Sequence, residues 1–259
     1  MPDTAGIGNA VRDRARREVN VEVCFFLFAY GDGTGNARAP VDPWLLEAAS
    51  REIQGLTRCV IHLPVELPDS DPLSKNHTSS PCCALQCYFD DLGLLETALQ
   101  TGGAMHRIVD RMADAAGARL TFAQQVMAVR PFSTPSPGDA DHHRAERCTY
   151  LVSYEGEADD FNAWLTHYIT HHPPLMAQLP GIRELEIYTR LDFRSGLTIP
   201  RAAAMQRNKV VFDTPEALAA ALASPIRAHM KQDFNAFPPY SGATPHFPMR
   251  SIYGNLKPT

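Results

Sequence analysis

The sequence predicts an α+β protein made of two tandem ferredoxin-like (βαββαβ) repeats, whose antiparallel sheets face each other as an α+β barrel. Two observations lead to this prediction. The 259 residues are 44% hydrophobic and 20% charged, which suits an ordinary packed core. Two landmarks of the first half, Gly55 and Phe89, also recur in the second half as Gly181 and Phe212. The two pairs are separated by nearly the same number of residues, which indicates an internal repeat.

The first half reads strand, helix, strand, strand, helix, strand. Hydrophobic alternation and turn residues place these elements at 21–30, 42–55, 57–63, 83–89, 92–117 and 119–132. Asp42 is the expected N-cap of the first helix, with Pro43 at its first helical position.

The second half repeats this order. Its elements are expected at 148–156, 161–181, 182–191, 208–213, 214–234 and 246–254. One ferredoxin-like sheet covers only one face with helices, so the second copy is the natural cover for the other face. We therefore predict a flexible tail at 1–18, a degenerate repeat at 19–132, a linker at 133–146 and a second repeat at 147–259.

Composition argues against several classes of partner. The net charge is −5 and basic residues cluster only in "RDRARR" near the N-terminus, so neither nucleic acid nor a membrane is an expected partner. No apolar run approaches the ~18 residues that span a bilayer, and the N-terminus lacks the hydrophobic region of a secretory signal. The six cysteines fall mostly in apolar strands, which favours buried thiols in the cytoplasm over a metal site.

One stretch resembles a known family. The segment "YLVSYEGEADDFNAWLTHYITHHPPLMAQLPGIRELEIY" has a strand, an aromatic-rich helix, a histidine followed by Pro-Leu, then Leu-Pro-Gly and a strand. This pattern is similar to the EthD-type dimeric α+β barrel family, over about residues 147–254. The histidine of the pattern falls on His172, followed by Pro173, Pro174 and Leu175. The first half carries Leu46 at the matching position, so only the second half has the signature.

The resemblance implies a cofactor-independent enzyme with acid–base chemistry: a lyase, isomerase or cyclase. Its substrate would be a small hydrophobic, often aromatic metabolite of a catabolic or secondary-metabolic pathway. No cofactor and no metal are expected, and pairing of two chains is left open. The substrate and the reaction are not defined by the sequence, because one fold serves many activities.

Two prolines next to His172 suggest how a base could be tuned. Proline lacks the amide hydrogen that a helix interior needs, so Pro173 is expected to interrupt the helix near His172. His172 would then lie at the N-terminus of a second short helical turn, where the helix dipole and burial both lower its pKa. A neutral imidazole can act as a general base. The alternative is that His172 only caps the kink.

Other polar and aromatic side chains complete the expected site. His246 and Tyr150 are the further catalytic candidates, as a proton carrier and as a donor to a developing oxyanion. The expected substrate-binding residues are Tyr154, Trp164, Asp233, Phe234, Tyr240, Arg250 and Tyr253. His246 and Arg250 share one face of a strand and Tyr253 lies on the other, and the sequence does not say which face lines the cavity. His167 and His171 are assigned no role.

Two further readings stay open. Tandem ferredoxin-like repeats also build the chlorite-dismutase-like barrels, in which one histidine binds haem iron. The chain could equally be a non-catalytic protein that binds an apolar ligand.

Overall fold

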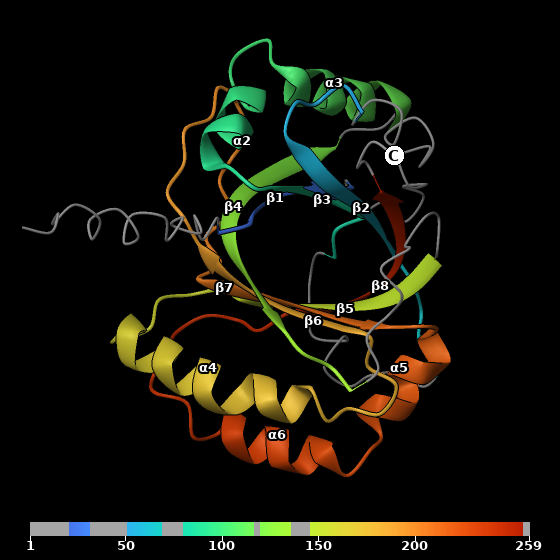
Figure 1. Cartoon of the computed structure of the whole chain (residues 1–259), viewed down its shortest axis with the longest axis vertical. Coiled ribbons are helices and arrows are strands. Elements are labelled where there is room, and N and C mark those ends of the chain that lie inside the picture. The colour runs from blue at the N-terminus through green and yellow to red at the C-terminus, as the bar shows by residue number, and fades with distance from the viewer. Residues whose placement is uncertain (1–20, 32–50, 69–79, 117–119, 136–145, 256–259) are drawn as a thin grey trace, which may run out of the picture.

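The computed structural model describes residues 21–31, 51–68, 80–116, 120–135 and 146–255. Its eight strands form one closed antiparallel barrel in the order β1-β3-β2-β8-β5-β7-β6-β4 (Figure 1). The strands are β1 (Val23–Tyr30), β2 (Leu56–Pro64), β3 (Cys83–Phe89), β4 (Thr121–Phe132), β5 (Glu146–Tyr154), β6 (Glu184–Arg190), β7 (Gln206–Phe212) and β8 (His246–Asn255). Each half keeps the ferredoxin-like order, β4-β1-β3-β2 and β8-β5-β7-β6, so the predicted fold class is confirmed.

The two sheets are joined at both edges. Ile61 of β2 lies opposite Ile252 of β8, and Val129 of β4 lies opposite Tyr188 of β6. Hydrogen bonding therefore continues from one repeat into the next and closes the ring. Closure removes the exposed edges at which other chains could add a strand.

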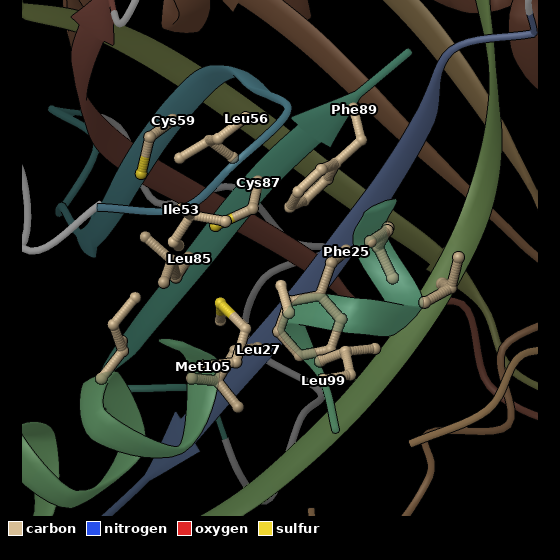
Figure 2. Packing of buried hydrophobic residues seen from close by; sticks show 14 of the residues in the cluster. Phe25, Leu27, Ile53, Leu56, Cys59, Leu85, Cys87, Phe89, Leu99 and Met105 are labelled. Carbon is tan, nitrogen blue, oxygen red and sulfur yellow. The ribbon is translucent and has the colours of Figure 1, made fainter. Parts of the chain in front are cut away.

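Helices cover the outside of this ring. The described helices are α2 (Leu92–Ala98), α3 (Ala104–Ala116), α4 (Phe161–Met176), α5 (Pro215–Leu222) and α6 (Ile226–Phe234). Figure 1 shows α2 and α3 over the first repeat, and α4, α5 and α6 over the second. In the first repeat, Phe25 and Leu27 point outward and pack with Leu99 and Met105 (Figure 2).

The inside of the ring is packed with side chains. Phe26 and Phe28 alternate with the outward residues of β1 and meet Tyr88 and Tyr188 from other strands. Both faces of each sheet are therefore buried, one inside the barrel and one under helices. The cavity described below lies outside this ring and not between the two sheets.

Two segments that the sequence predicts as single long helices each form two helices in the structure. The segment expected as one helix over 92–117 is divided into α2 and α3 at Gly102, whose φ of 74° suits glycine. The segment expected over 214–234 is divided into α5 and α6 because Pro225 has no amide hydrogen with which to continue α5. Thr214 caps α5 by accepting a hydrogen bond from the Ala217 amide.

Several predictions fall wholly or mostly outside the described residues: the tail at 1–18, the helix at 42–55 and the linker at 133–146. All six cysteines lie within the described part and are free thiols, five of them buried. Within the described ranges, no helix has the length and apolar character needed to cross a bilayer.

The repeated glycines allow a matched stability test. Gly55 and Gly181 have φ values of 78° and 76°, a region in which side chains are strained. A methyl group at Gly181 would meet nothing within 4 Å, whereas at Gly55 it would lie 2.6 Å from Cδ1 of Leu94. Gly181→Ala is expected to lower the free energy of unfolding by about 1 kcal/mol. Gly55→Ala should cost about 1–3 kcal/mol more, since it also overpacks Leu94.

Urea denaturation of both variants measures this difference. Equal losses at the two positions would show that Leu94 moves away freely and would contradict the expected packing.

Candidate functional site

The helix α4 turns one buried stripe toward the outer face of the second sheet. Trp164, Tyr168, His172 and Met176 recur every four residues and are all buried. Asp160 begins the helix by accepting a hydrogen bond from the Ala163 amide. The helical period therefore carries His172 into the layer between the helices and the sheet, where the residue is only 6% exposed.

The predicted helix break at Pro173 does not occur. Pro173 and Pro174 lie inside α4, which continues to Met176 and is closed by the Ala177 amide bonding to the Pro173 carbonyl at 2.9 Å. The prolines occupy the last turn, so they cost only the two bonds to the carbonyls of the preceding turn. Pro173 and Met176 are buried, and this burial holds the last turn in place on the side of α4 that faces the sheet. His172 thus lies within a helix, not at an N-terminus, and the dipole argument for its pKa fails.

A carboxylate from α6 holds the imidazole. Nδ1 of His172 lies 2.8 Å from Oδ2 of Asp233, and Nε2 of His167 lies 3.1 Å from Oδ1 of the same carboxylate. An ionised carboxylate only accepts hydrogen bonds, so Nδ1 of His172 carries the proton and Nε2 keeps its lone pair. Burial lowers the pKa of His172 below its ordinary 6.5, and Asp233 offsets this only in part. The ring is therefore neutral at pH 7.

His172 lines a cavity of about 660 Å³ between the second sheet and its three helices. The floor comes from the outward faces of β5, β7 and β8, and the walls from α4, α5 and α6. Figure 1 shows these three helices on the outer side of the second sheet. The apolar lining comprises Leu67, Val152, Met176, Leu179, Val210, Phe212, Leu218, Ala219, Leu222, Ala223, Ala228, Met230 and Phe234. The polar lining comprises Tyr150, Tyr154, His172, Asn208, Arg227, Lys231, Asn235 and His246.

The structure brings most of the predicted site residues together. His172, His246, Tyr150, Tyr154 and Phe234 all line the cavity. Asp233, expected to bind substrate, does not line the cavity but lies directly behind His172, with its carboxylate against Nδ1 of that ring.

Two aromatic residues stand behind the lining. Trp164 and Tyr240 pack against Tyr154, at ring-centroid distances of 5.2 and 6.0 Å, and do not themselves line the cavity. They support the wall from behind Tyr154, so their expected contact with substrate is not provided by the lining of this cavity.

Two predicted residues are elsewhere. Arg250 is at the surface, where its guanidinium bonds Glu146 at 2.7 Å. Tyr253 points into the barrel, with the Lys209 ammonium 5.0 Å above its ring. The period of two along β8 explains this: the helix-facing side carries His246, and Tyr253 is on the opposite side. Arg250 shares the face of His246 but lies four residues further along the strand, past the cavity.

Sequence reasoning missed several polar residues of this region. Asn208 is 1% exposed and lies on the cavity floor, and His167 shares the Asp233 carboxylate with His172. Arg227 and Lys231 line the cavity from α6. The spacing of Arg227 and Lys231, one turn apart and on the same helix as Asp233, was the available signal.

Metal ligation by protein side chains alone is not indicated. Within the described ranges, no group of three or more histidine, cysteine or acidic side chains is placed to hold a metal ion. His172 faces the cavity with an imidazole whose Nδ1 is held by the Asp233 carboxylate.

Solved structures resemble this chain in fold. An anthrone oxidase-like protein superposes with a TM-score of 0.58, at 14% identity, covering 93% of this chain and 95% of that one. A protein from Lactobacillus acidophilus NCFM, provisionally named a monooxygenase, gives a TM-score of 0.51 at 10% identity, covering 91% and 97%. Such identities show the fold alone, which is that of tandem α+β barrels.

The comparisons do not establish the EthD-type family that the sequence resembles. An ethyl tert-butyl ether D (EthD) family protein from Bacillus halodurans C-125 is 18% identical over 39% of this chain and 94% of its own, with a TM-score of 0.33. No protein-family model matches the chain, and no curated protein matches its sequence.

Proposed function

We propose that this chain is an enzyme that removes a proton from a weakly acidic carbon or hydroxyl group of an apolar aromatic substrate, with His172 as the general base. The observation that carries the proposal is the bond from Nδ1 of His172 to Asp233. That bond fixes the tautomer and leaves the Nε2 lone pair for the substrate. A positioned base of this kind contributes about 10²–10⁴-fold to a rate.

The surroundings of His172 suit such a reaction. Burial keeps the imidazole neutral at pH 7, so it is ready to accept a proton. As the imidazole takes up a proton, the adjacent Asp233 carboxylate stabilises the positive charge. The cavity volume of about 660 Å³ lies within the usual range for small-molecule sites, and its mainly apolar walls suit an aromatic ring system.

Proton removal is a step that several reaction classes share. Lyases, isomerases and cyclases begin in this way, and so can the oxidation of an activated aromatic carbon. Because two neighbours in fold are named an anthrone oxidase-like protein and a monooxygenase, anthrone is a suitable probe. The proposal concerns the proton transfer and leaves open which of these reactions follows it.

Exchange of substrate hydrogen for deuterium tests this step without knowledge of the final product. Anthrone, deoxybenzoin and 2-tetralone, three aromatic carbon acids, are incubated with the protein in D₂O, and loss of the acidic C–H signal is followed by proton NMR. We expect at least ~10²-fold acceleration over buffer for one of them. The rate should still be high near pH 6.5 and fall only at lower pH, through the lowered pKa of His172, because the protonated ring cannot act as a base.

Heat-unfolded protein is the control for exchange by surface groups. Exchange no faster than this control for all three compounds would contradict the proposal.

A second candidate is a haem protein, and the same bond favours it. Histidines that ligate metals commonly donate their other ring N–H to a carboxylate, as His172 does to Asp233. An iron porphyrin would be held through Nε2 of His172, with Arg227 and Lys231 available for its carboxylates. When bound, it would supply redox chemistry at iron.

The absorption spectrum separates the two candidates. A Soret band in the purified protein, absent from a His172→Ala variant, would favour haem and set aside the cofactor-free proposal.

A further inference from the structure

Two cationic side chains face the cavity from α6. Arg227 and Lys231 lie four residues apart, and therefore on one face of that helix, and both line the cavity. Arg227 is half-buried and Lys231 is exposed. Neither belongs to the catalytic arrangement of His172 and Asp233, so their presence at an otherwise apolar cavity requires a separate explanation.

These cations have no acidic partner in the part of the chain that the structure describes. Arg58 and Lys209, by contrast, pair with Glu186 and Glu184 at 2.6 and 2.8 Å. Among the described residues that line the cavity, none is an aspartate or glutamate. Asp233, on the same helix, already accepts bonds from His172 and His167. The cavity therefore presents two positive charges without a compensating carboxylate, which favours an anionic ligand.

Arg227 and the base belong to the same cavity. Burial lowers the pKa of His172 most, Asp233 raises it, and Arg227 and His167 lower it further. Arg227 and His172 both line the cavity, so one small molecule that occupies it can contact the guanidinium and the imidazole together.

We propose that the ligand of this cavity is an aromatic acid, whose anionic group binds Arg227 and Lys231 while its ring system lies between Val152, Val210 and Leu218. The inference rests on the proposed function, because it assigns a substrate class to the same cavity. An arginine fork matches the two oxygens of a carboxylate or sulfonate, and a nearby lysine adds a point charge. The anion fixes which end of the substrate enters first, so the acidic carbon is presented to Nε2 of His172.

A pair of fluorescent probes isolates the charge. ANS (8-anilinonaphthalene-1-sulfonate) and N-phenyl-1-naphthylamine share one aromatic skeleton and differ only by the sulfonate. The double variant Arg227→Gln/Lys231→Gln is expected to bind ANS at least ~10-fold more weakly, as a charge-assisted contact implies. Its affinity for N-phenyl-1-naphthylamine should stay within about 2-fold, because the apolar walls are unchanged.

Two control variants make the result specific. Arg190→Gln/Arg201→Gln removes the same formal charge from exposed residues that do not line the cavity and should leave ANS affinity within about 2-fold. Ala219→Trp fills the cavity and should weaken both probes, provided that its thermal melt shows a folded protein. The inference would be overturned if the Arg227/Lys231 change left ANS affinity unaltered or weakened both probes equally. It would also be overturned if ANS still bound the Ala219→Trp variant.

This experiment measures binding and not proton transfer. If the Arg227/Lys231 change leaves ANS affinity unaltered while the starting protein still catalyses deuterium exchange, the substrate class alone is overturned. If that change weakens ANS selectively but the starting protein shows no exchange, the proposed function is overturned and the anion site stands.

Discussion

Replacing His172 with asparagine is expected to reduce deuterium exchange of the carbon acid by at least ~10²-fold, to the rate of buffer alone. Asparagine can still donate a hydrogen bond to Asp233 and fills a similar volume, so the helix and its contacts should persist. It cannot accept a proton at neutral pH. The change therefore removes the basic group while the wall of the cavity stays in place. Proton NMR of anthrone in D₂O measures the effect.

The neighbouring histidine provides the control. His171 is exposed on the same helix, and His171→Asn should leave the exchange rate unchanged. Binding of N-phenyl-1-naphthylamine to His172→Asn should stay within about 2-fold of the unchanged protein, since the apolar lining is intact. If both variants exchanged equally fast, another group would be the base. If no exchange occurred in the starting protein but ligand bound, the chain would be a binding protein.

The alternation of strands and helices was enough to predict the barrel. Gly55 and Gly181, the landmarks of the repeat, both have a positive φ and both precede the second strand of their half. A glycine is needed at such a position whatever surrounds it, so the signal survives divergence of the rest. The two strands that end in Phe89 and Phe212 are likewise β3 and β7, the matching strands of the two repeats.

The sequence could not indicate whether the cavity lies inside the barrel or between a sheet and its helices. Strand β1 is buried at nearly every position, because one face packs inside the barrel and the other under α2 and α3. A strand of this kind shows no polar face, so its pattern does not tell inside from outside. The same ambiguity made Tyr253 a candidate for the site, although it faces the interior of the barrel.

Contacts between helices also could not be predicted from the local sequence pattern. His172 and Asp233 are 61 residues apart in the chain and meet because α4 packs on α6. The residue types made Asp233 a plausible partner, but only the packing of two helices selects it. The prediction that α4 breaks at Pro173 failed for a related reason. The tendency of proline to end a helix is outweighed by the burial of the last turn of α4, on the side of the helix that faces the sheet.

Replacing Lys209 with methionine is expected to destabilise the fold by about 3–5 kcal/mol. The ammonium is fully buried inside the barrel, 2.8 Å from Oε2 of Glu184 and 3.2 Å from Oε2 of Glu186. Methionine fills the space of the lysine side chain but removes the positive charge beside the two carboxylates. Water cannot solvate them in its place, because the site is buried. Arg58 still pairs with Glu186, so Glu184 loses most. Urea denaturation at pH 7 measures the loss of stability.

The pH dependence identifies the cause. Burial raises the pKa of Glu186, but Lys209 and Arg58 lower it more, so it stays below the ordinary value of 4.5. A carboxylate with a lowered pKa stabilises the fold above pH 4.5 and loses this contribution as the pH falls. The gap between Lys209→Met and the unchanged protein should therefore shrink below pH 4.5, where protonated carboxyls need no counter-ion. The same substitution at exposed Lys231 should cost less than about 0.5 kcal/mol. A loss at Lys209 as small as that, or one independent of pH, would mean that the buried charges inside the barrel contribute nothing to its stability.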